Sequence, residues 1–194
     1  MLKNEWGKIY SHILPVVYIV GSEPANPCYK IFTELGLQIA RWFANFKDIN
    51  SKELGSLVDT LFNGISSKEN SSLREYCAEC IGEFIKYTIK QRKPEELKAE
   101  HENIKIVVRR LQNYSGHPDS FKRLGALLTL KKILKHIANE EFLREKYCFD
   151  LADSCLSISK KGTTLNAEEN KDFSHVHFFL FFPLKNYILR SRPK

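Results

Sequence analysis

Apolar residues recur at steps of three and four along most of the chain, the spacing that places them on one side of an α-helix. A clear example follows Ser51, a residue type that caps helix starts, and ends near Gly64. The apolar positions of this segment are Leu54, Leu57, Val58, Leu61, Phe62 and Ile65. We therefore expect an amphipathic helix that begins after Ser51.

A second stripe follows the polar loop SSKENSS and contains a Cys-x-x-Cys pair, Cys77 and Cys80. Its inward positions are Leu73, Tyr76, Cys77, Cys80, Ile81, Phe84, Ile85 and Thr88. A zinc site needs four converging ligands, and the sequence has no second Cys-x-x-Cys and no histidines in the paired spacing of a zinc finger. A redox pair normally starts a helix that follows a strand, whereas LREY already forms helix upstream. Core packing is therefore favoured, with metal binding and redox chemistry as the alternatives.

The remaining segments repeat the helical spacing, and none shows the alternation of a strand. The predicted helices cover residues 4–20 with a kink at Pro15, 26–46, 94–114, 119–141 and 142–156. In the 26–46 helix the predicted inward face is Cys28, Phe32, Leu35, Ile39, Trp42, Phe43 and Phe46. Asp119 or Ser120 is expected to cap the 119–141 helix.

These helices fall into pairs. The second helix of each pair begins near Asn26, Ser72 and Asp119, which are 46 and 47 residues apart. Such a period is typical of HEAT and armadillo arrays. The last two of these helices also place an arginine, Arg74 or Arg123, three residues before a small inward residue. The sequence therefore predicts an all-α, HEAT/armadillo-like α-solenoid of about three helix pairs plus a further helix, over residues 1–158.

The C-terminal part, residues 159–194, departs from this pattern. We expect it to be a linker followed by an atypical apolar tail over residues 172–194, which would be an incomplete or alternative chain end. A capping helix and a membrane-surface anchor are the alternatives. An array that is cut through a pair leaves an apolar face bare, so the chain is also expected to have neighbours.

Charge and cysteine content bear on partners and compartment. The formal net charge is +7, which favours association with polyanions. The candidate polyanion surface is Lys122, Arg123, Lys131, Lys132 and Lys135. A solvated helix face is the alternative, and Arg123 could instead hold the interhelical loop by bonding Asp119 or local carbonyls. Five thinly spread cysteines and a charged N-terminal stretch favour a reducing compartment. No apolar run reaches the length of about 18 residues that a membrane span requires, so no membrane partner is expected.

Catalytic patterns are missing from the sequence. There is no serine with a neighbouring base, no paired catalytic carboxylates and no glycine-rich phosphate loop. His117 lies in the turn GHPD and is more typical of a structural residue. We therefore name no catalytic, cofactor-binding or metal-binding residue, and we expect no cofactor.

Several collinear segments resemble a known family. They are WGKIYSHILPVV, LQIARWFANFKDINSKE, LFNGI, SSLREYCAECIGEFIKYTIKQ and HPDSFKRLGALLTLKKI. In this order and spacing, from Glu5 to Leu156, they resemble the N-terminal helical-repeat (HEAT) region of the DNA-dependent protein kinase catalytic subunits, within the phosphatidylinositol-3-kinase-related kinase family.

The resemblance implies a segment of a ring-like α-solenoid cradle, a nuclear location and a role in repairing DNA double-strand breaks by non-homologous end joining. In that family the complete protein is a serine/threonine kinase recruited to DNA ends by the Ku heterodimer. The implied partners are therefore the rest of the kinase chain, Ku and double-stranded DNA ends. The family's kinase domain lies far C-terminal to this region, and its motifs are missing here, so this chain is not expected to be an enzyme. The alternative is a free-standing HEAT-repeat adaptor that binds a protein partner.

Overall fold

The computed structural model describes residues 3–45, 51–99 and 102–160, and every regular element within these ranges is an α-helix. The helices are α1 (Lys3–Gly21), α2 (Tyr29–Phe43), α3 (Lys52–Ile65), α4 (Ser71–Lys90), α5 (Pro94–Ala99), α6 (Glu102–Ser115), α7 (Ser120–Asn139) and α8 (Glu141–Lys160). The all-α prediction is confirmed.

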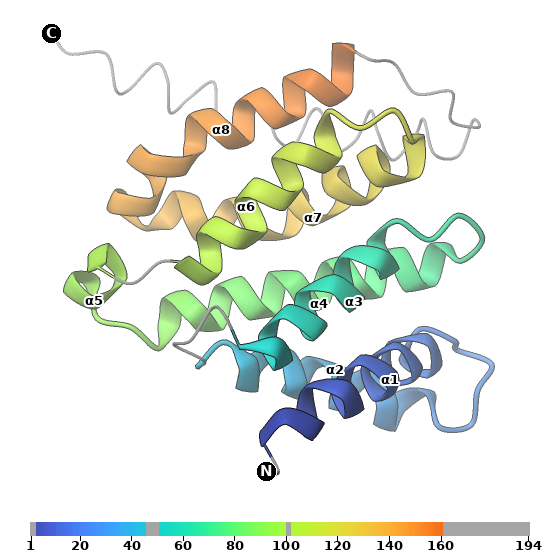
Figure 1. Ribbon diagram of the computed structural model, residues 1–194. Coiled ribbons are helices and arrows are strands. Elements are labelled where there is room, and N and C mark those ends of the chain that lie inside the picture. The colour runs from blue at the N-terminus through green and yellow to red at the C-terminus, as the bar shows by residue number, and fades with distance from the viewer. Residues whose placement is uncertain (1–2, 46–50, 100–101, 161–194) are drawn as a thin grey trace, which may run out of the picture.

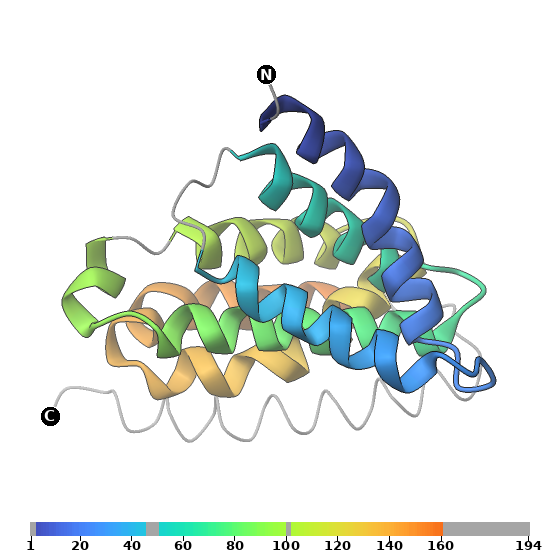
Figure 2. The same ribbon diagram turned by 90° about the horizontal axis from the view of Figure 1, so that it is seen from below.

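The helices stack as pairs in two layers. One layer holds α1, α3 and α6, and the other holds α2, α4 and α7 (Figures 1 and 2). Helix α8 packs on α6 and α7, where the first helix of a further pair would lie. The second helices begin 42 and 49 residues apart, close to the predicted period. The predicted solenoid of three pairs plus a further helix is therefore confirmed.

The core lies between the two layers. The predicted stripes of α3 and α4 are buried there, with Leu57, Ile65 and Ile85 all fully inaccessible to solvent. Each such aliphatic side chain stabilises the fold by roughly 1.5–3 kcal/mol relative to leaving it exposed. The helix starts also agree with the sequence, because the Ser51 hydroxyl accepts a hydrogen bond from the Leu54 amide at 3.2 Å.

The predicted inward face of α2 is partly wrong. Cys28, Leu35 and Trp42 are exposed, and the buried positions of the helix are Gly36, Ala40 and Phe43. Helix α2 approaches its neighbours so closely that a Cβ on Gly36 would overlap the hydroxyl of Tyr76. Small residues therefore form much of the contact face, while large apolar residues on the other side remain uncovered. Phe46 lies outside the described residues.

Two further expectations concern segment ends. The single helix expected over residues 94–114 is described as two helices, α5 and α6, and Leu97 of α5 is buried in the core. The predicted linker begins at residue 159, whereas α8 continues to Lys160. Residues 161–194 lie outside the described ranges, so the interpretations of the tail stay predictions.

Candidate functional site

Two of the three loops between paired helices, the α3–α4 and α6–α7 loops, are each held by a buried arginine. Arg123 is only 5% exposed, and its Nη1 donates to the carbonyl oxygens of His117 at 2.9 Å and Pro118 at 2.7 Å. Arg74 occupies the same place in the preceding pair and donates to the carbonyls of Ser67 and Lys68 at 2.8 and 3.4 Å. The alternative expectation for Arg123, bonding to local carbonyls, is confirmed, and Arg123 is not part of an exposed polyanion surface.

The two arginine-held loops also contact each other. Lys68 pairs with Asp119 at 3.7 Å, and the guanidinium of Arg74 lies 5.4 Å from the centre of the Phe121 ring. Asp119 also caps α7 by accepting from the Phe121 amide at 2.9 Å, as the sequence predicted. Charged groups at this end of the helices therefore join consecutive repeats to one another.

The four lysines of the predicted polyanion surface differ in what they contact. The ammonium of Lys122 lies 5.2 Å from the centre of the Tyr114 ring and 3.4 Å from His117 Nε2. Lys132 pairs with Glu79 of α4. Lys131 and Lys135 are exposed on α7. The structure brings these two lysines together on one face, and their binding of a polyanion stays a prediction.

A cationic cluster that the sequence analysis did not name surrounds Tyr87. The charged groups of Arg41, Lys86 and Lys90 lie 5.4, 5.6 and 5.8 Å from the centre of its ring. Glu83 accepts from Arg41 at 3.0 Å and from Lys86 at 2.6 Å. Burial opposes ionisation of this carboxyl, but the bonds from Lys86 and Arg41 outweigh it and hold the pKa of Glu83 below its usual value. The Glu83–Lys86 spacing is visible in the sequence, whereas Arg41 is brought in by the fold.

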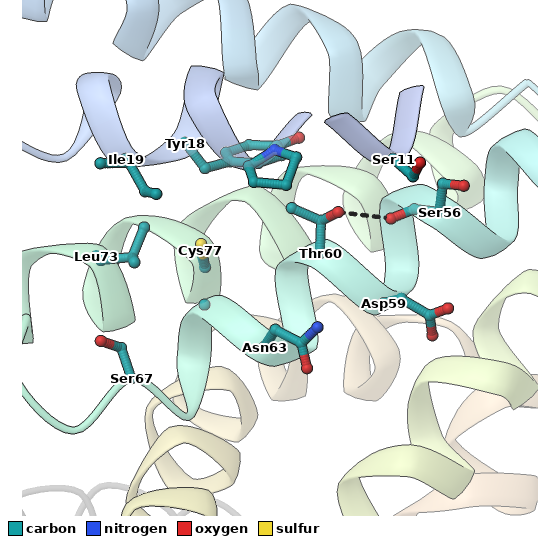
Figure 3. Close-up of a pocket in the computed structure, with 12 residues that line it drawn as sticks. Ser11, Tyr18, Ile19, Ser56, Asp59, Thr60, Asn63, Ser67, Leu73 and Cys77 are labelled. Atoms are coloured by element: carbon teal, nitrogen blue, oxygen red, sulfur yellow. Dashed lines mark hydrogen bonds between the residues drawn. The ribbon is translucent and has the colours of Figure 1, made fainter. Parts of the chain in front are cut away.

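A cavity of about 440 Å³ opens between α1 and α3, with α4 as its floor (Figure 3). Its polar lining comes mainly from α3. The Thr60 hydroxyl donates to the Ser56 carbonyl at 2.7 Å, the Ser56 hydroxyl donates to the carbonyl of Lys52 at 2.9 Å, and Asp59 pairs with Arg110 at 2.6 Å. These hydroxyls bond their own helix, so the arrangement does not pair a nucleophile with a base. The cavity can accommodate an apolar group but offers no evident chemistry.

Cys77 lies at the floor of this cavity, and Cys80 lies one turn further along α4. Both side chains are fully buried and neither forms a disulfide. Burial raises the pKa of both thiols well above the usual value, which suppresses the reactive thiolate. Core packing, the favoured interpretation of the pair, is confirmed. Across residues 3–45, 51–99 and 102–160, no three His, Cys, Asp or Glu side chains are grouped to hold a metal ion.

Large apolar side chains are exposed along α1 and α2, at one end of the array. We call this surface the N-terminal edge and define it as Ile9, Ile13, Val16, Ile31, Leu35 and Trp42. Within the part of the chain that the structure describes, no helix combines the length and the apolarity needed to cross a bilayer.

Comparison with known proteins decides the family. The family model described as DNA-dependent protein kinase catalytic subunit, CC1/2, matches residues 5–157. The chain belongs to the DNA-dependent protein kinase catalytic subunit family. The resemblance drawn from the sequence is thereby confirmed, and the matched range covers the three helix pairs of the described array except for the first two residues of α1.

Individual relatives agree with this family. The chain is 32% identical over 143 residues to the DNA-dependent protein kinase catalytic subunit of Canis lupus familiaris, and 31% identical over the same length to that of Mus musculus. These matches cover 74% of the chain. The protein of the same name from Dictyostelium discoideum is 21% identical over 160 residues, or 82% of the chain. The chain spans about 4% of the length of each of these relatives.

Proposed function

We propose that the chain is a non-catalytic helical scaffold segment of a DNA-dependent protein kinase catalytic subunit, and that it acts in the nucleus in double-strand break repair by non-homologous end joining. The observation that supports this proposal is the family match over most of the chain. Polar side chains of the solenoid are used for contacts within the fold. Arg74 and Arg123 hold loops, and the cavity hydroxyls of Ser56 and Thr60 bond their own helix.

The mechanism we propose is positioning. Stacked helix pairs form an extended surface of fixed shape, and such arrays place distant partners relative to one another. The proposed partners are the rest of the kinase chain, the Ku heterodimer and double-stranded DNA ends. Lys122, Lys131, Lys132 and Lys135 remain the proposed polyanion contacts, from which Arg123 is now removed. Phosphoryl transfer would belong to a kinase domain elsewhere in the parent protein and not to this segment.

The proposal is tested by isolating the native polypeptide with an antibody against residues 51–91 from cells that encode the chain. We expect a polypeptide far larger than the calculated 22.6 kDa that co-purifies with Ku after DNA breakage. Deletion of residues 51–139 from the gene should then slow the rejoining of double-strand breaks. A discrete 22.6 kDa species without Ku, together with normal break rejoining, would favour the free-standing adaptor instead.

A further inference from the structure

A second, smaller groove lies between α3 and α6, the first helices of consecutive pairs (Figures 1 and 2). It has a volume of about 320 Å³ and lies at the N-terminal halves of both helices. Its lining is Leu54, Gly55, Val58, Ile106, Arg109 and Arg110. The groove thus combines an apolar floor, made by the leucine, the valine and the isoleucine, with two arginines along one side.

Side chains join α3 and α6 on the C-terminal side of this groove. The rings of Phe62 and Tyr114 pack edge to face with their centres 5.2 Å apart, and the guanidinium of Arg110 lies 5.5 Å from the centre of the Phe62 ring. Arg110 also pairs with Asp59 at 2.6 Å. The groove is therefore a preformed feature whose walls are held by contacts within the fold.

Gly55 lines the groove, and its surroundings differ from those of other glycines within helices. A Cβ on Gly36, Gly64 or Gly125 would overlap an atom of a neighbouring helix, so each of these glycines permits a close approach inside the array. A Cβ on Gly55 would meet no atom within 4 Å. Glycine inside a helix costs about 1 kcal/mol relative to alanine, and no described part of the chain uses the space that Gly55 leaves. That space is open to a molecule outside this chain.

The groove also has a cation without an acidic partner. The carboxylate of Asp59 pairs with Arg110, and the carboxylate of Glu102 pairs with Lys105 at 2.7 Å. Arg109 is exposed, and its guanidinium forms no ion pair with any residue that the structure describes. A carboxylate of a bound molecule would therefore meet an unpaired guanidinium beside an apolar floor, which favours a charge-assisted hydrogen bond.

We propose that this groove binds an amphipathic helix of a partner protein, with an apolar side chain against the floor and a carboxylate on Arg109. Gly55 lets the main chain of that helix come close to α3, as Gly125 lets α7 come close to α3 within the fold. Amphipathic helices bind apolar grooves through anchors that are three or four residues apart.

Two other occupants fit the groove less well. An extended peptide would leave its main-chain groups unpaired over the apolar floor, because the amides and carbonyls of α3 and α6 are bonded within their own helices. Duplex DNA binds to rows of cations, whereas one of the two arginines here is already neutralised by Asp59. The inference depends on the geometry of this groove, so it can hold or fail independently of the proposed role in repair.

The experiment is a selection of peptides from a random library displayed on phage, with the purified 194-residue chain as the target. The displayed peptides have about 15 residues, which is enough for four helical turns. Selected peptides are synthesised with a fluorescent label, and their affinity is measured by fluorescence anisotropy. We expect a consensus with apolar residues three or four positions apart and with Asp or Glu beside them.

Two variants test the groove itself. Gly55→Leu fills the space above the floor, and Arg109→Glu reverses the unpaired charge, so each should weaken binding of the selected peptides by about tenfold or more. Replacing the peptide carboxylate by lysine should restore binding to Arg109→Glu, which a misfolded variant could not show. Neither substitution should lower the free energy of unfolding, because Gly55 faces open space and Arg109 is exposed.

The matched controls are Ser72→Leu and Lys131→Glu, which make comparable changes at exposed positions of α4 and α7. Both should bind the selected peptides as the unchanged chain does. A consensus without acidic residues, equal binding by Gly55→Leu, or the absence of any selected peptide would overturn the proposal. So would displacement of the peptide by an equimolar DNA duplex, or dimerisation of the chain that Gly55→Leu abolishes, since either would give the groove a different occupant.

Discussion

Two apolar helix faces of this array have similar side chains but differ in solvent exposure, because one is covered by neighbouring helices and the other is not. Val58 and Phe62 of α3 are 5 and 1% exposed where α6 and α7 pack on them, whereas Ile13 and Val16 of α1 are 51 and 54% exposed at the N-terminal edge. Apolar spacing alone therefore does not separate a covered face from an uncovered one. The covered interface is distinguished by contacts between backbones and by charged groups that link its loops.

Removing the backbone contact should have the largest effect. A Cβ on Gly125 of α7 would overlap the carbonyl oxygen of Ile65 of α3, so Gly125→Ala should lower the free energy of unfolding by about 3 kcal/mol or more. Urea denaturation measures this. The control is Gly55→Ala, because a Cβ there meets no atom within 4 Å and alanine is the better helix former. Equal stability of the two variants would contradict the close approach.

Loss of a loop-holding arginine should have the next largest effect. Arg123→Met keeps the length of the side chain but removes the donors to two carbonyls, so we expect a loss of about 2 kcal/mol in unfolding free energy. Arg74→Met should behave alike, because Arg74 has the same role one repeat earlier. Lys122→Met is the control on the same helix and should cost less than about 1 kcal/mol. An unchanged unfolding free energy for Arg123→Met would show that the loop does not depend on the guanidinium of Arg123.

Loss of the side-chain hydrogen bonds that join α4 to α2 should have a smaller effect on stability. The Tyr76 hydroxyl donates to the backbone carbonyls of Phe32 and Thr33, at 3.1 and 2.7 Å, and so ties α4 to α2. Tyr76→Phe should therefore cost about 1 kcal/mol in denaturation experiments. Tyr87→Phe, which retains the ring that its cationic neighbours face, should cost less. The reverse order would argue against the α2–α4 hydrogen bonds.

Acid should weaken the charged link between α2 and α4. Because the pKa of Glu83 is below 4.5 in the folded state, this group adds stability that is fully present above about pH 4.5 and is lost as pH falls through the lower, folded-state value. Glu83→Gln should remove this part of the pH dependence, with a change below about 1 kcal/mol at pH 7. Unfolding measured between pH 3 and pH 7 tests this, and an unchanged profile would contradict it.

Polar substitutions at the N-terminal edge should have the smallest effect on folding. Val16→Gln and Ile31→Gln replace exposed side chains on helices, so each should change the unfolding free energy of the chain by less than about 0.5 kcal/mol. The buried counterpart Val58→Gln provides the contrast and should be strongly destabilising. A large loss from Val16→Gln would mean that the edge is already covered within the chain.

Much of the fold could be predicted because α3 and α4 each have a single apolar stripe along the helix. The stripe of α3, its cap at Ser51 and the buried Cys77 and Cys80 all follow from spacing and residue type. Helix α2 could not be predicted as well, because it has one face of large apolar residues and another of small residues. Its large residues Leu35 and Trp42 look like core, yet the neighbouring helices pack on Gly36 and Ala40.

The site was less predictable for a related reason. Basic residues close in sequence, such as Lys131 and Lys132, have different surroundings, since one is exposed and the other pairs with Glu79 on another helix. The cluster at Tyr87 depends on Arg41, which is brought in from α2. Charge along a helix can be read from the sequence, but which charges are paired depends on the neighbouring helix.

The buried arginines have a consequence for sequence divergence. Arg74 and Arg123 bind backbone carbonyls, which every residue type provides, so the loop side chains are free to change. The loops SSKEN and GHPD indeed share no residue in order and differ in length by one, yet both are held in the same way. An array built on such joints can therefore lose sequence identity in its loops over evolutionary time while its helices keep their spacing, because the arginine needs only the backbone of the loop.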